Sequence, residues 1–314
     1  MESKLKIGIS ACVIGYKVRF NAGHKRSAFC TDQLGEFADF IPVCPEVAIG
    51  LPTPRPTIRQ ILNNEIITVS KPDGSGDVTQ ALKDFGKAHA NTTQDMAGFI
   101  FCAKSPTCGM ERVKVYYHHG KGSASTGVGV FAEQIMKANP CLPVEENDRL
   151  NDPVIKENFI TRVFVYQRWL ETKKSGITKH KLITFHRAHK YLVMSHHVES
   201  YRALGQLLAR ADMPLEQQAD DYIHGLMTAL KIKATRKTHT NTLQHLQGYF
   251  KKQLSPEKKQ ALSDEITAYR EGYSPLLVPL TLINHHLKEF PNQYLSDQVY
   301  LTPHPKELKL RYGY

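Results

Sequence analysis

The sequence predicts an α/β domain at residues 1–152, Rossmann-like, with a mostly parallel sheet and helices on both faces, followed by an all-α domain at residues 153–314. Three observations carry this prediction. Apolar strand-like runs alternate with helix-like periodicity in the first half, which is typical of parallel sheets covered by helices. Beyond residue 155 the strand pattern ends and long helical periodicity replaces it. The 314 residues are also long for one core and suit two domains.

The first domain begins with a strand at residues 4–11 and continues to a second strand that ends at Cys44. Between them, Thr31 can cap a short helix over residues 31–39. The stretch LPTPRPT that follows has too many prolines for a helix or a strand. The remaining expected elements are strands at 65–70, 97–103 and 141–144, an amphipathic helix at 78–89, and a helix after the glycine-rich stretch 120–129.

The second domain is predicted to contain helices alone. Ser255 followed by Pro256 is a good helix start, with serine as the cap and proline at the first helical position. The expected helices cover residues 155–171, 183–210, 215–231, 240–253, 257–269 and 280–290.

The composition excludes several classes of protein. With 41% hydrophobic and 23% charged residues, the chain is an ordinary globular protein. No apolar run approaches the length of a membrane span, and the start MESKLKIGIS lacks the apolar core of a secretion signal. We therefore expect a cytoplasmic protein that binds no membrane. Six cysteines are too sparse for a disulfide scaffold and indicate metal binding, catalysis or burial.

The two halves of the chain differ in charge. Residues 1–150 hold 17 Lys and Arg against 15 Asp and Glu, whereas residues 151–314 hold 24 against 15. A near-neutral half joined to a basic half indicates a chemical unit attached to a unit that binds a polyanion. The alternative is a solvated basic surface without a partner, which charge alone does not exclude.

Three cysteines, Cys12, Cys44 and Cys108, each lie where a strand-like run breaks into a turn. Open α/β sheets build their sites just beyond the carboxyl ends of the strands. Three thiolates meeting there would hold a soft metal or an iron–sulfur cluster, with one coordination position left for a substrate. The spacing is unlike that of zinc ribbons, whose ligands come as close CxxC pairs. The alternative is three buried free cysteines, and their shared placement favours ligation.

Two polar residues lie beside these cysteines. Glu46 places a carboxylate two residues after Cys44, and Ser105 places a hydroxyl three residues before Cys108. A carboxylate near a metal site can move a proton or position water, and a hydroxyl can hydrogen-bond a developing charge. Alternatively, Glu46 caps a helix or pairs with Arg55, and Ser105 is a turn residue.

Several motifs resemble known families. The segments SAC at 10–12, PVCPE at 42–46, GLPTPR at 50–55 and KSPTCG at 104–109 resemble the TudS-type thiouracil desulfidases. The segments FHRAHKYLVMSHH at 185–197 and NTLQHLQGYFKK at 241–252 resemble the YbgA-type helical domain. The combination resembles the RudS-type desulfidases, which act on 4-thiouridine in tRNA.

The resemblance implies that Cys12, Cys44 and Cys108 hold a 4Fe–4S cluster through three irons, with the fourth iron open to the thiocarbonyl sulfur of the base. Water would then attack C4 in a hydrolytic reaction without net electron transfer. Glu46 and Ser105 fall at the positions that the family uses catalytically.

The chain departs from the expected motif at one position. Thr107 stands where we expect serine, a conservative change that should leave ligation intact. The resemblance assigns no role to Cys30, Cys102 and Cys141, so we expect these three cysteines to be structural.

Basic and glycine-rich segments near the cysteines are candidates for binding a nucleotide phosphate. Five residues that follow Cys12 closely could contact the phosphate: Arg19, Asn21, His24, Lys25 and Arg26. The glycine-rich loop 120–129, which contains Ser123 and Ser125, could supply backbone N–H donors at a helix start. It lacks the Gly-Lys-Ser/Thr ending of a P-loop, which argues against ATP. The alternative for both segments is an ordinary loop.

The partner implied is tRNA carrying 4-thiouridine, and no obligate protein partner is evident. Basic residues of the helical half should bind the tRNA backbone and give a steep salt dependence. The candidates are Arg162, Arg168, Lys173, Lys174, Lys181, Arg187, Lys190, Lys231, Lys233, Arg236 and Lys237.

The sequence therefore supports three hypotheses. The first is an iron–sulfur desulfidase that converts 4-thiouridine in tRNA to uridine. The second is the same chemistry on free thiouracil or 4-thiouridine monophosphate, against which the added basic domain argues. The third is a nucleic-acid-binding accessory protein with a structural metal; three ligands in place of four argue against it, because structural sites are normally closed.

Overall fold

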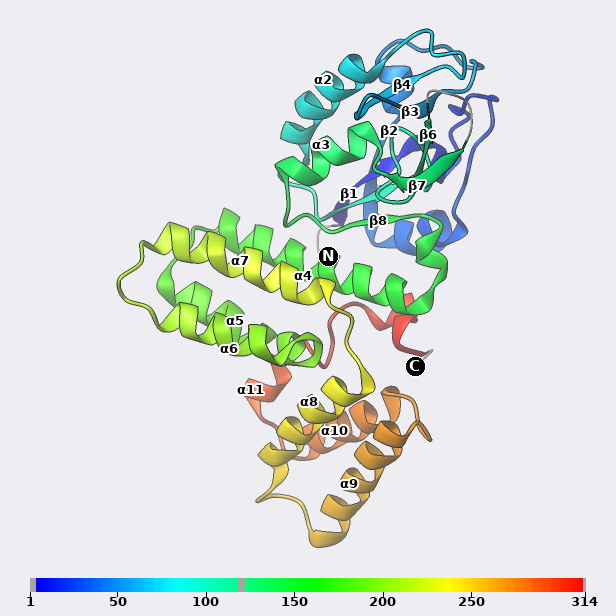
Figure 1. Cartoon of the computed structure of the whole chain (residues 1–314). Helices are drawn as coiled ribbons and strands as arrows, with labels where there is room; N and C mark the ends of the chain where they lie inside the picture. Colours follow the sequence, from blue (N-terminus) through cyan, green and yellow to red (C-terminus); the bar gives the residue numbers. More distant parts are fainter. Residues whose placement is uncertain (1–3, 118–121, 313–314) are drawn as a thin grey trace. The chain divides into compact units, whose positions relative to one another are not determined.

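The computed structural model describes residues 4–117 and 122–312 (Figure 1). The chain divides into two compact units, the first extending to Phe159 and the second beginning at Ile160. The first unit contains strands and helices, and the described part of the second unit contains helices and turns. The predicted fold class, an α/β domain followed by an all-α domain, is confirmed.

The first unit is built on a four-stranded parallel sheet in the order β2-β1-β5-β8. Every residue of β5 is buried, and β1 is buried except at Lys6, as expected for a parallel sheet covered on its faces. Because the strands are parallel, the chain leaves β1, β2 and β5 at the same edge of the sheet. The strands are β1 (Leu5–Ser10), β2 (Ala38–Val43), β5 (Gly98–Phe101) and β8 (Val144–Glu146).

A second four-stranded sheet, in the order β4-β3-β6-β7, was not predicted as a separate sheet. Its β3–β6 pair is parallel and its outer pairs are antiparallel. Only β4 corresponds to an expected strand. Residues 123–127 form strand β7 and not a glycine-rich loop, while residues 120 and 121 lie outside the described part of the chain. The strands are β3 (Arg59–Asn63), β4 (Ile66–Ser70), β6 (Val113–Tyr117) and β7 (Ser123–Gly127).

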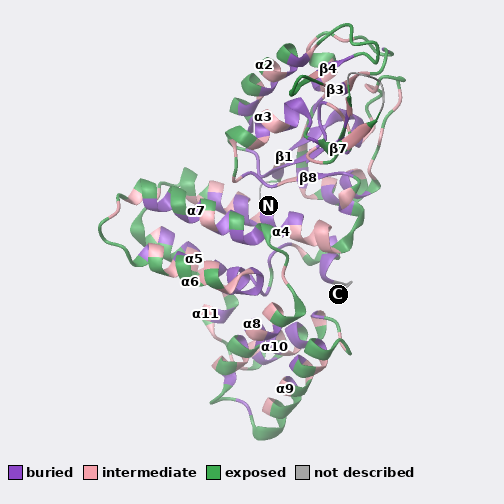
Figure 2. Cartoon of the chain, in the orientation of Figure 1, coloured by how far each residue is buried: buried purple, intermediate pink, exposed green. Residues whose placement is uncertain are grey.

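Helices α2 (Thr79–Ala90) and α3 (Val130–Ala138) lie side by side (Figure 1). Phe85 of α2 stacks on Phe131 of α3, with 5.7 Å between the ring centroids. Phe131 in turn contacts Phe99 and Phe101 of β5 edge-on. This aromatic layer holds both helices against the parallel sheet, and the outward face of α2 is exposed (Figure 2).

The prediction of a helix at residues 31–39 is wrong. The chain forms a π turn at Phe29–Gln33 and a 3₁₀ turn at Leu34–Glu36, and β2 already begins at Ala38. Pairing of β2 with β1, with Ala38 opposite Leu5, places these last residues in the sheet. Tertiary pairing therefore overrides the local helix signal.

The remaining helices, of which α4 already begins in the first unit, are close to those expected. The expected helix 183–210 is two helices, because the chain breaks at His197, whose ring accepts a hydrogen bond from the Ser200 N–H and caps the second helix. Ser255 caps α9 with proline at its first position, as predicted. The helices are α4 (Pro153–Lys174), α5 (Lys179–His196), α6 (Val198–Ala209), α7 (Leu215–Lys231), α8 (Arg236–Gln247), α9 (Pro256–Glu271), α10 (Leu277–Glu289) and α11 (Gln293–Ser296). Among the described residues, no helix is long and apolar enough to span a membrane.

The first turn of α3 supports the loop that carries Cys108. The N–H groups of Gly129, Val130 and Phe131 donate to carbonyl oxygens of the loop 106–109 at 2.7, 3.2 and 3.0 Å. A helix start normally leaves these donors without partners inside the helix, so the loop both caps α3 and is held by it. At Gly129 the two segments are so close that a Cβ would lie 2.6 Å from the Thr107 carbonyl.

Replacing Gly129 by alanine should therefore destabilise the protein by roughly 2 kcal/mol or more, because a rigid backbone segment must move to make room. The matched control is Gly205→Ala in α6, where nothing lies within 4 Å of the added Cβ. This control should be neutral or raise stability by up to about 1 kcal/mol. The midpoint of urea unfolding measures both. Equal stability of the two variants would contradict the close approach at Gly129.

Candidate functional site

The three predicted cysteine ligands lie at the carboxyl edge of the parallel sheet. Cys12 lies in the 3₁₀ turn Ala11–Ile14 directly after β1. Cys44 follows β2 and precedes α1 (Pro45–Ala48). Cys108 lies in the loop after β5. The expectation that the sheet edge brings these turns together is met, because the three strands are parallel neighbours.

One cavity of about 350 Å³ opens at this edge. Its volume is at the lower end of the range of small-molecule pockets, which suits a single ring or a small inorganic group. The residues predicted as ligands and catalytic groups all line it: Cys12, Cys44, Cys108, Glu46 and Ser105.

Glu46 is held by an arginine in the cavity wall. Arg55 donates to Glu46 Oε2 from Nε at 2.9 Å and from Nη2 at 2.6 Å, and its side chain is only 4% exposed. The guanidinium also donates to the carbonyl oxygens of Val18 and Pro52 and to the Thr53 hydroxyl, at 2.9–3.1 Å. Both interpretations of Glu46 thus hold geometrically: it pairs with Arg55 and it faces the cavity.

Ser105 reaches Glu46 through Thr107. The Thr107 hydroxyl donates to Glu46 Oε1 at 2.8 Å, which leaves its oxygen to accept from the Ser105 hydroxyl at 2.9 Å. Ser105 Oγ accepts in turn from the backbone N–H groups of Thr107 and Cys108 at 3.2 and 3.1 Å. The result is a hydroxyl chain, Ser105–Thr107–Glu46, that points its donors toward the carboxylate.

The loop that carries this chain is fixed at both ends. Asn147 Oδ1 accepts from the Ala103 N–H at 2.9 Å, and Glu146 Oε1 accepts from the Met110 N–H at 2.8 Å. Between them, Lys104 adopts φ 61°, in the left-handed region that non-glycine residues rarely enter. This turn directs the chain from β5 into the segment that begins at Ser105.

The thiols of the three predicted ligands have raised pKa values, which favours their neutral forms. Burial raises the pKa of Cys44 and of Cys108. A hydrogen bond with Cys102, together with burial, raises the pKa of Cys12. Such thiols become ligands when a cation stabilises their thiolates.

Cys102 is a cavity residue that sequence reasoning missed. The sequence predicts a structural role for it, but it lines the cavity at the end of β5 and interacts with Cys12. Its place at a strand end in GFIFC was the available signal. Cys30 is fully buried and Cys141 half-buried, and neither lines the cavity.

Two of the five basic or polar residues predicted after Cys12 line the cavity, namely Arg19 and Lys25. Lys25 pairs with Asp148 at 2.7 Å. The remaining three do not line it and have local partners: Asn21 accepts from the Gly23 N–H, His24 accepts from the Arg26 N–H, and Arg26 pairs with Asp32.

The expectation for the glycine-rich stretch is not met. Ser123 and Ser125 lie in β7, paired with Tyr116 and Lys114 of β6, and neither lines the cavity. The N–H donors at the start of α3 are already engaged by the loop 106–109. The described residues of this segment, 122–129, therefore support the cysteine loop and do not offer a phosphate cradle.

The basic candidates of the second unit divide by exposure. Arg162 is 6% exposed, so its guanidinium does not face the surface. Arg168, Lys181 and Lys190 are half-buried, and Arg168 donates to the Pro303 carbonyl at 3.0 Å. The exposed candidates are Lys173, Lys174, Arg187, Lys231, Lys233, Arg236 and Lys237. Of these, Arg187 pairs with Asp297 and Arg236 donates to the Tyr269 carbonyl.

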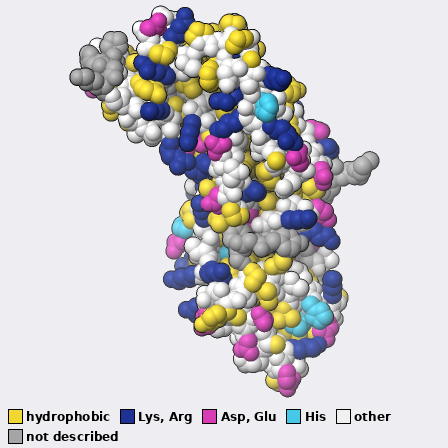
Figure 3. All heavy atoms as spheres, turned by 90° about the vertical axis from the view of Figure 1, so that its right-hand side faces the viewer, with side chains coloured by type: hydrophobic (Ala, Val, Ile, Leu, Met, Phe, Trp, Pro, Cys, Tyr) yellow, Lys and Arg dark blue, Asp and Glu magenta, His cyan; other side chains and the backbone are white. Residues whose placement is uncertain are grey.

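On the described surface that Figure 3 shows, Lys and Arg side chains are interspersed with Asp and Glu side chains. On this face, the basic side chains are not gathered into one continuous patch. Such a surface suits weak contacts to a phosphate backbone more than recognition of a sequence.

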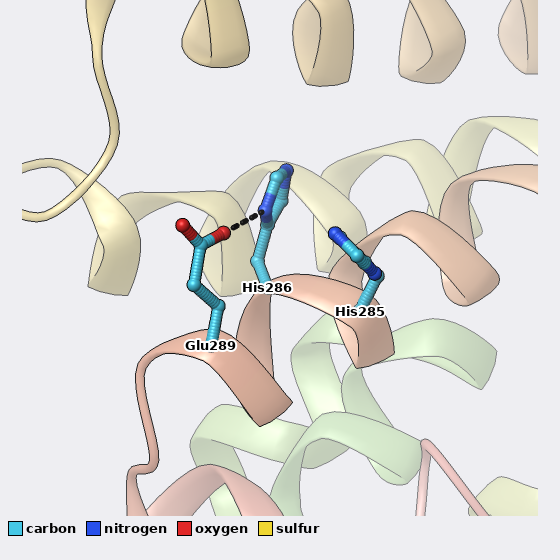
Figure 4. A group of neighbouring side chains, drawn as sticks. All are labelled: His285, His286 and Glu289. Carbon is cyan, nitrogen blue, oxygen red and sulfur yellow. Dashed lines mark ion pairs between the residues drawn. The ribbon is translucent and has the colours of Figure 1, made fainter.

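A second group of metal-type side chains lies on α10. His285, His286 and Glu289 place their ligand atoms within 4.8 Å of one another, with His286 between the other two (Figure 4). His286 is buried, and burial lowers its pKa. However, the Lys258 ammonium already contacts Glu289 at 2.5 Å, so a metal ion would meet a like charge at this carboxylate. We interpret the group as a link between α9 and α10.

The fold and the cavity together define a class: an α/β unit with a thiol-lined cavity and an ion-paired carboxylate at the strand ends, joined to a helical unit. Residues 7–147 match the family described as 2-thiouracil desulfurase, and residues 190–305 match a family described as a protein of unknown function (DUF1722). The uncharacterized protein YbgA of Escherichia coli (strain K12) is 32% identical over 161 residues, which cover 50% of this chain and 94% of YbgA.

The chain therefore belongs to the family of YbgA, and its residues 7–147 match the 2-thiouracil desulfurase family. Among solved structures, the 4Fe-4S-dependent thiouracil desulfidase TudS is 28% identical, covers 48% of this chain and 95% of its own, and has a TM-score of 0.40. The predicted resemblance to thiouracil desulfidases and to a YbgA-type domain is confirmed. The assignment to tRNA 4-thiouridine stays a prediction.

Removing the Arg55 guanidinium should destabilise the site strongly. In Arg55→Met, the Glu46 carboxylate, whose side chain is 13% exposed, loses its counter-charge. The free energy of unfolding should fall by roughly 3 kcal/mol, as when one partner of a buried ion pair is removed. Adding Glu46→Gln should recover part of this loss.

Urea unfolding followed by circular dichroism measures the effect. The control is Arg210→Met, which breaks an exposed pair with Asp212 and should leave the free energy of unfolding nearly unchanged. A loss of stability as small in Arg55→Met as in the control would contradict the stabilising role of the Arg55–Glu46 pair.

Proposed function

We propose that the protein is an iron–sulfur desulfidase that converts 4-thiouridine in tRNA to uridine. The observation that carries the proposal is the meeting of three strand-end cysteines with Glu46 and Ser105 in one cavity. The 2-thiouracil desulfurase family supports the desulfidase chemistry, and the soft thiol ligands of the cavity support a 4Fe–4S cofactor, on which TudS also depends. The cytoplasm, where tRNA occurs, is the expected location.

The residues present fit a 4Fe–4S cluster. Cys12, Cys44 and Cys108 would hold it, because soft thiolates are the ligands that iron–sulfur clusters prefer and all three line the cavity. When bound, the cluster supplies a soft iron without a protein ligand, which can bind and polarise the thiocarbonyl sulfur. Its positive charge would also stabilise thiolates whose pKa values burial raises.

The reaction exchanges sulfur for oxygen without oxidation or reduction. A C–O bond forms at C4, the C–S bond breaks, and the two protons of water leave with the sulfide as hydrogen sulfide or pass to a base. Glu46 is the group that accepts a proton from the attacking water. Both Arg55 donors use Oε2 of its carboxylate, and Thr107 donates to Oε1, so Oε1 keeps a lone pair for the cavity.

Ser105 orients the water or the base by hydrogen bonding. Its oxygen is held by two backbone N–H groups, and its proton is directed to Thr107. A small change of rotor would redirect that proton into the cavity. Ser105 and Glu46 then act as one hydrogen-bonded unit through the intervening hydroxyl.

The tRNA part of the proposal rests on the basic second unit. Its exposed lysines, among them Lys173, Lys174, Lys233 and Lys237, can contact phosphates. A second candidate substrate is the free nucleotide 4-thiouridine monophosphate or thiouracil itself. The size of the cavity, about 350 Å³, favours neither, because both substrates present the same single base to it.

Anaerobically purified protein should show the visible absorption of an iron–sulfur cluster and remove sulfur from thiolated tRNA. Cys44→Ala should lose both. Glu46→Gln should keep the absorption and lose about 100-fold or more in kcat, because it cannot accept the proton. A Cys44→Ala protein that keeps cluster and activity would overturn the ligand assignment, and loss of sulfur only from the nucleotide would remove the tRNA assignment.

The helical unit should bind tRNA through phosphates. Lys173→Glu with Lys174→Glu should weaken tRNA binding and lower the slope of log Kd against log salt concentration by roughly one for each lost contact. The KM for 4-thiouridine monophosphate should not change. The matched control is Lys71→Glu with Lys87→Glu, which reverses the charge of two exposed lysines in the first unit. Identical salt slopes for the variant, the control and the parent would rule out this surface.

Thr107 should act as a positioning residue. Thr107→Val keeps the shape but breaks the hydroxyl chain, so kcat should fall about tenfold with cluster content and KM little changed. Thr107→Ser restores the hydroxyl and should restore kcat. If serine fails to rescue while the cluster is intact, the methyl group and not the hydroxyl is what matters at this position.

A further inference from the structure

Phe20 is an apolar side chain in the wall of the cavity for which the proposed chemistry has no use. Its side chain is 38% exposed, and it lines the same cavity as Glu46 and Ser105. A single exposed apolar residue is ordinary on a protein surface. Tyr16 is such a residue, since it is 52% exposed and does not line the cavity. The position of Phe20 is what sets it apart.

The backbone of Phe20 is fixed to the catalytic groups. Its carbonyl oxygen accepts from the Arg55 N–H at 2.8 Å, and the carbonyl of Val18, two residues earlier, accepts from the Arg55 guanidinium at 2.9 Å. The same guanidinium holds Glu46. On the other side of the loop, the Lys25 N–H donates to the Cys12 carbonyl at 2.8 Å. The loop therefore keeps a set distance from both the carboxylate and the first cysteine.

The neighbour of Phe20 carries a positive charge. The Arg19 guanidinium lies over the Phe20 ring, 5.6 Å from its centroid, and also lines the cavity. An aromatic face beside a guanidinium matches the two parts of a nucleotide, a flat base and an anionic phosphate. Lys25, by contrast, is paired with Asp148.

We propose that Phe20 is the surface on which the pyrimidine ring of the substrate stacks, with Arg19 beside it to contact the 5′ phosphate. This proposal rests on the proposed function, because it names how that site takes a pyrimidine nucleotide. Stacking suits the task, since every pyrimidine has a π-face and the base must lie flat to present its C4 substituent to the cysteines. Phe20 contacts the ring and takes no part in bond making.

The experiment compares Phe20→Ala, Phe20→Leu and the control Tyr16→Ala in the full-length cluster-containing protein. In Phe20→Ala, the KM for 4-thiouridine monophosphate should rise roughly tenfold or more, with kcat less affected. Phe20→Leu keeps an apolar side chain without a π-face, so its KM should be close to that of Phe20→Ala. Tyr16→Ala should match the parent.

A second readout does not depend on turnover. Equilibrium dialysis gives the Kd of uridine monophosphate, the product-like nucleotide, for each variant, and it should rise by the same factor as KM. An unchanged Kd and KM in Phe20→Ala, with cluster absorption intact, would overturn the stacking role and leave the desulfidase proposal standing. If the parent shows no turnover but its Kd still depends on Phe20, the desulfidase proposal is overturned and the stacking role stands.

Discussion

The ion pair between Arg55 and Glu46 is the interaction on which the site depends. The Glu46 carboxylate, whose side chain is 13% exposed, would be costly to bury alone, and the guanidinium neutralises it. Arg55 has more donors than Glu46 can use, and it gives the rest to the carbonyls of Val18 and Pro52. One side chain thus joins the loop after β1 to the turn after α1. Because both segments carry residues of the cavity, their geometry relative to Glu46 is set by a single planar group.

The topology of the parallel sheet explains why much of the site could be predicted. Each of Cys12, Cys44 and Cys108 follows a short strand of the parallel sheet, and such a sheet brings the strand ends to one edge. The local pattern contains this information. It does not contain the path of the chain after each strand, which depends on capping and on distant contacts. Sequence reasoning missed Cys102 for this reason: the turn at Lys104 and the bond from Asn147 decide which way the end of β5 faces.

The second sheet shows the complementary limit. Ser123–Gly127 is rich in small residues that favour loops, and it becomes strand β7 because β6 offers it a pairing edge. The glycines that suggested a phosphate cradle are needed for close approach: a Cβ at Gly127 would lie 2.2 Å from the Gln60 side chain, and Gly129 touches the cysteine loop. Gln60 donates to the Pro106 and Val128 carbonyls and so ties this sheet to that loop. Such long-range reasons for a glycine leave no mark in a single sequence.

In the proposed function, the two units would answer different parts of the problem that a base inside tRNA poses. A cavity of about 350 Å³ at the end of a sheet admits one base, so a stacked base must be extruded before its C4 can reach the cysteines. Extrusion costs a few kcal/mol of unstacking that a free nucleotide does not incur. Stacking on Phe20 can return part of that energy inside the cavity, and phosphate contacts by exposed lysines of the helical unit can supply the rest without reading sequence. A small thio-base would need only the stacking on Phe20. Exposed lysines and a small cavity are therefore consistent with the proposed function, in which affinity would come from contacts to the phosphate backbone and selectivity from the sulfur.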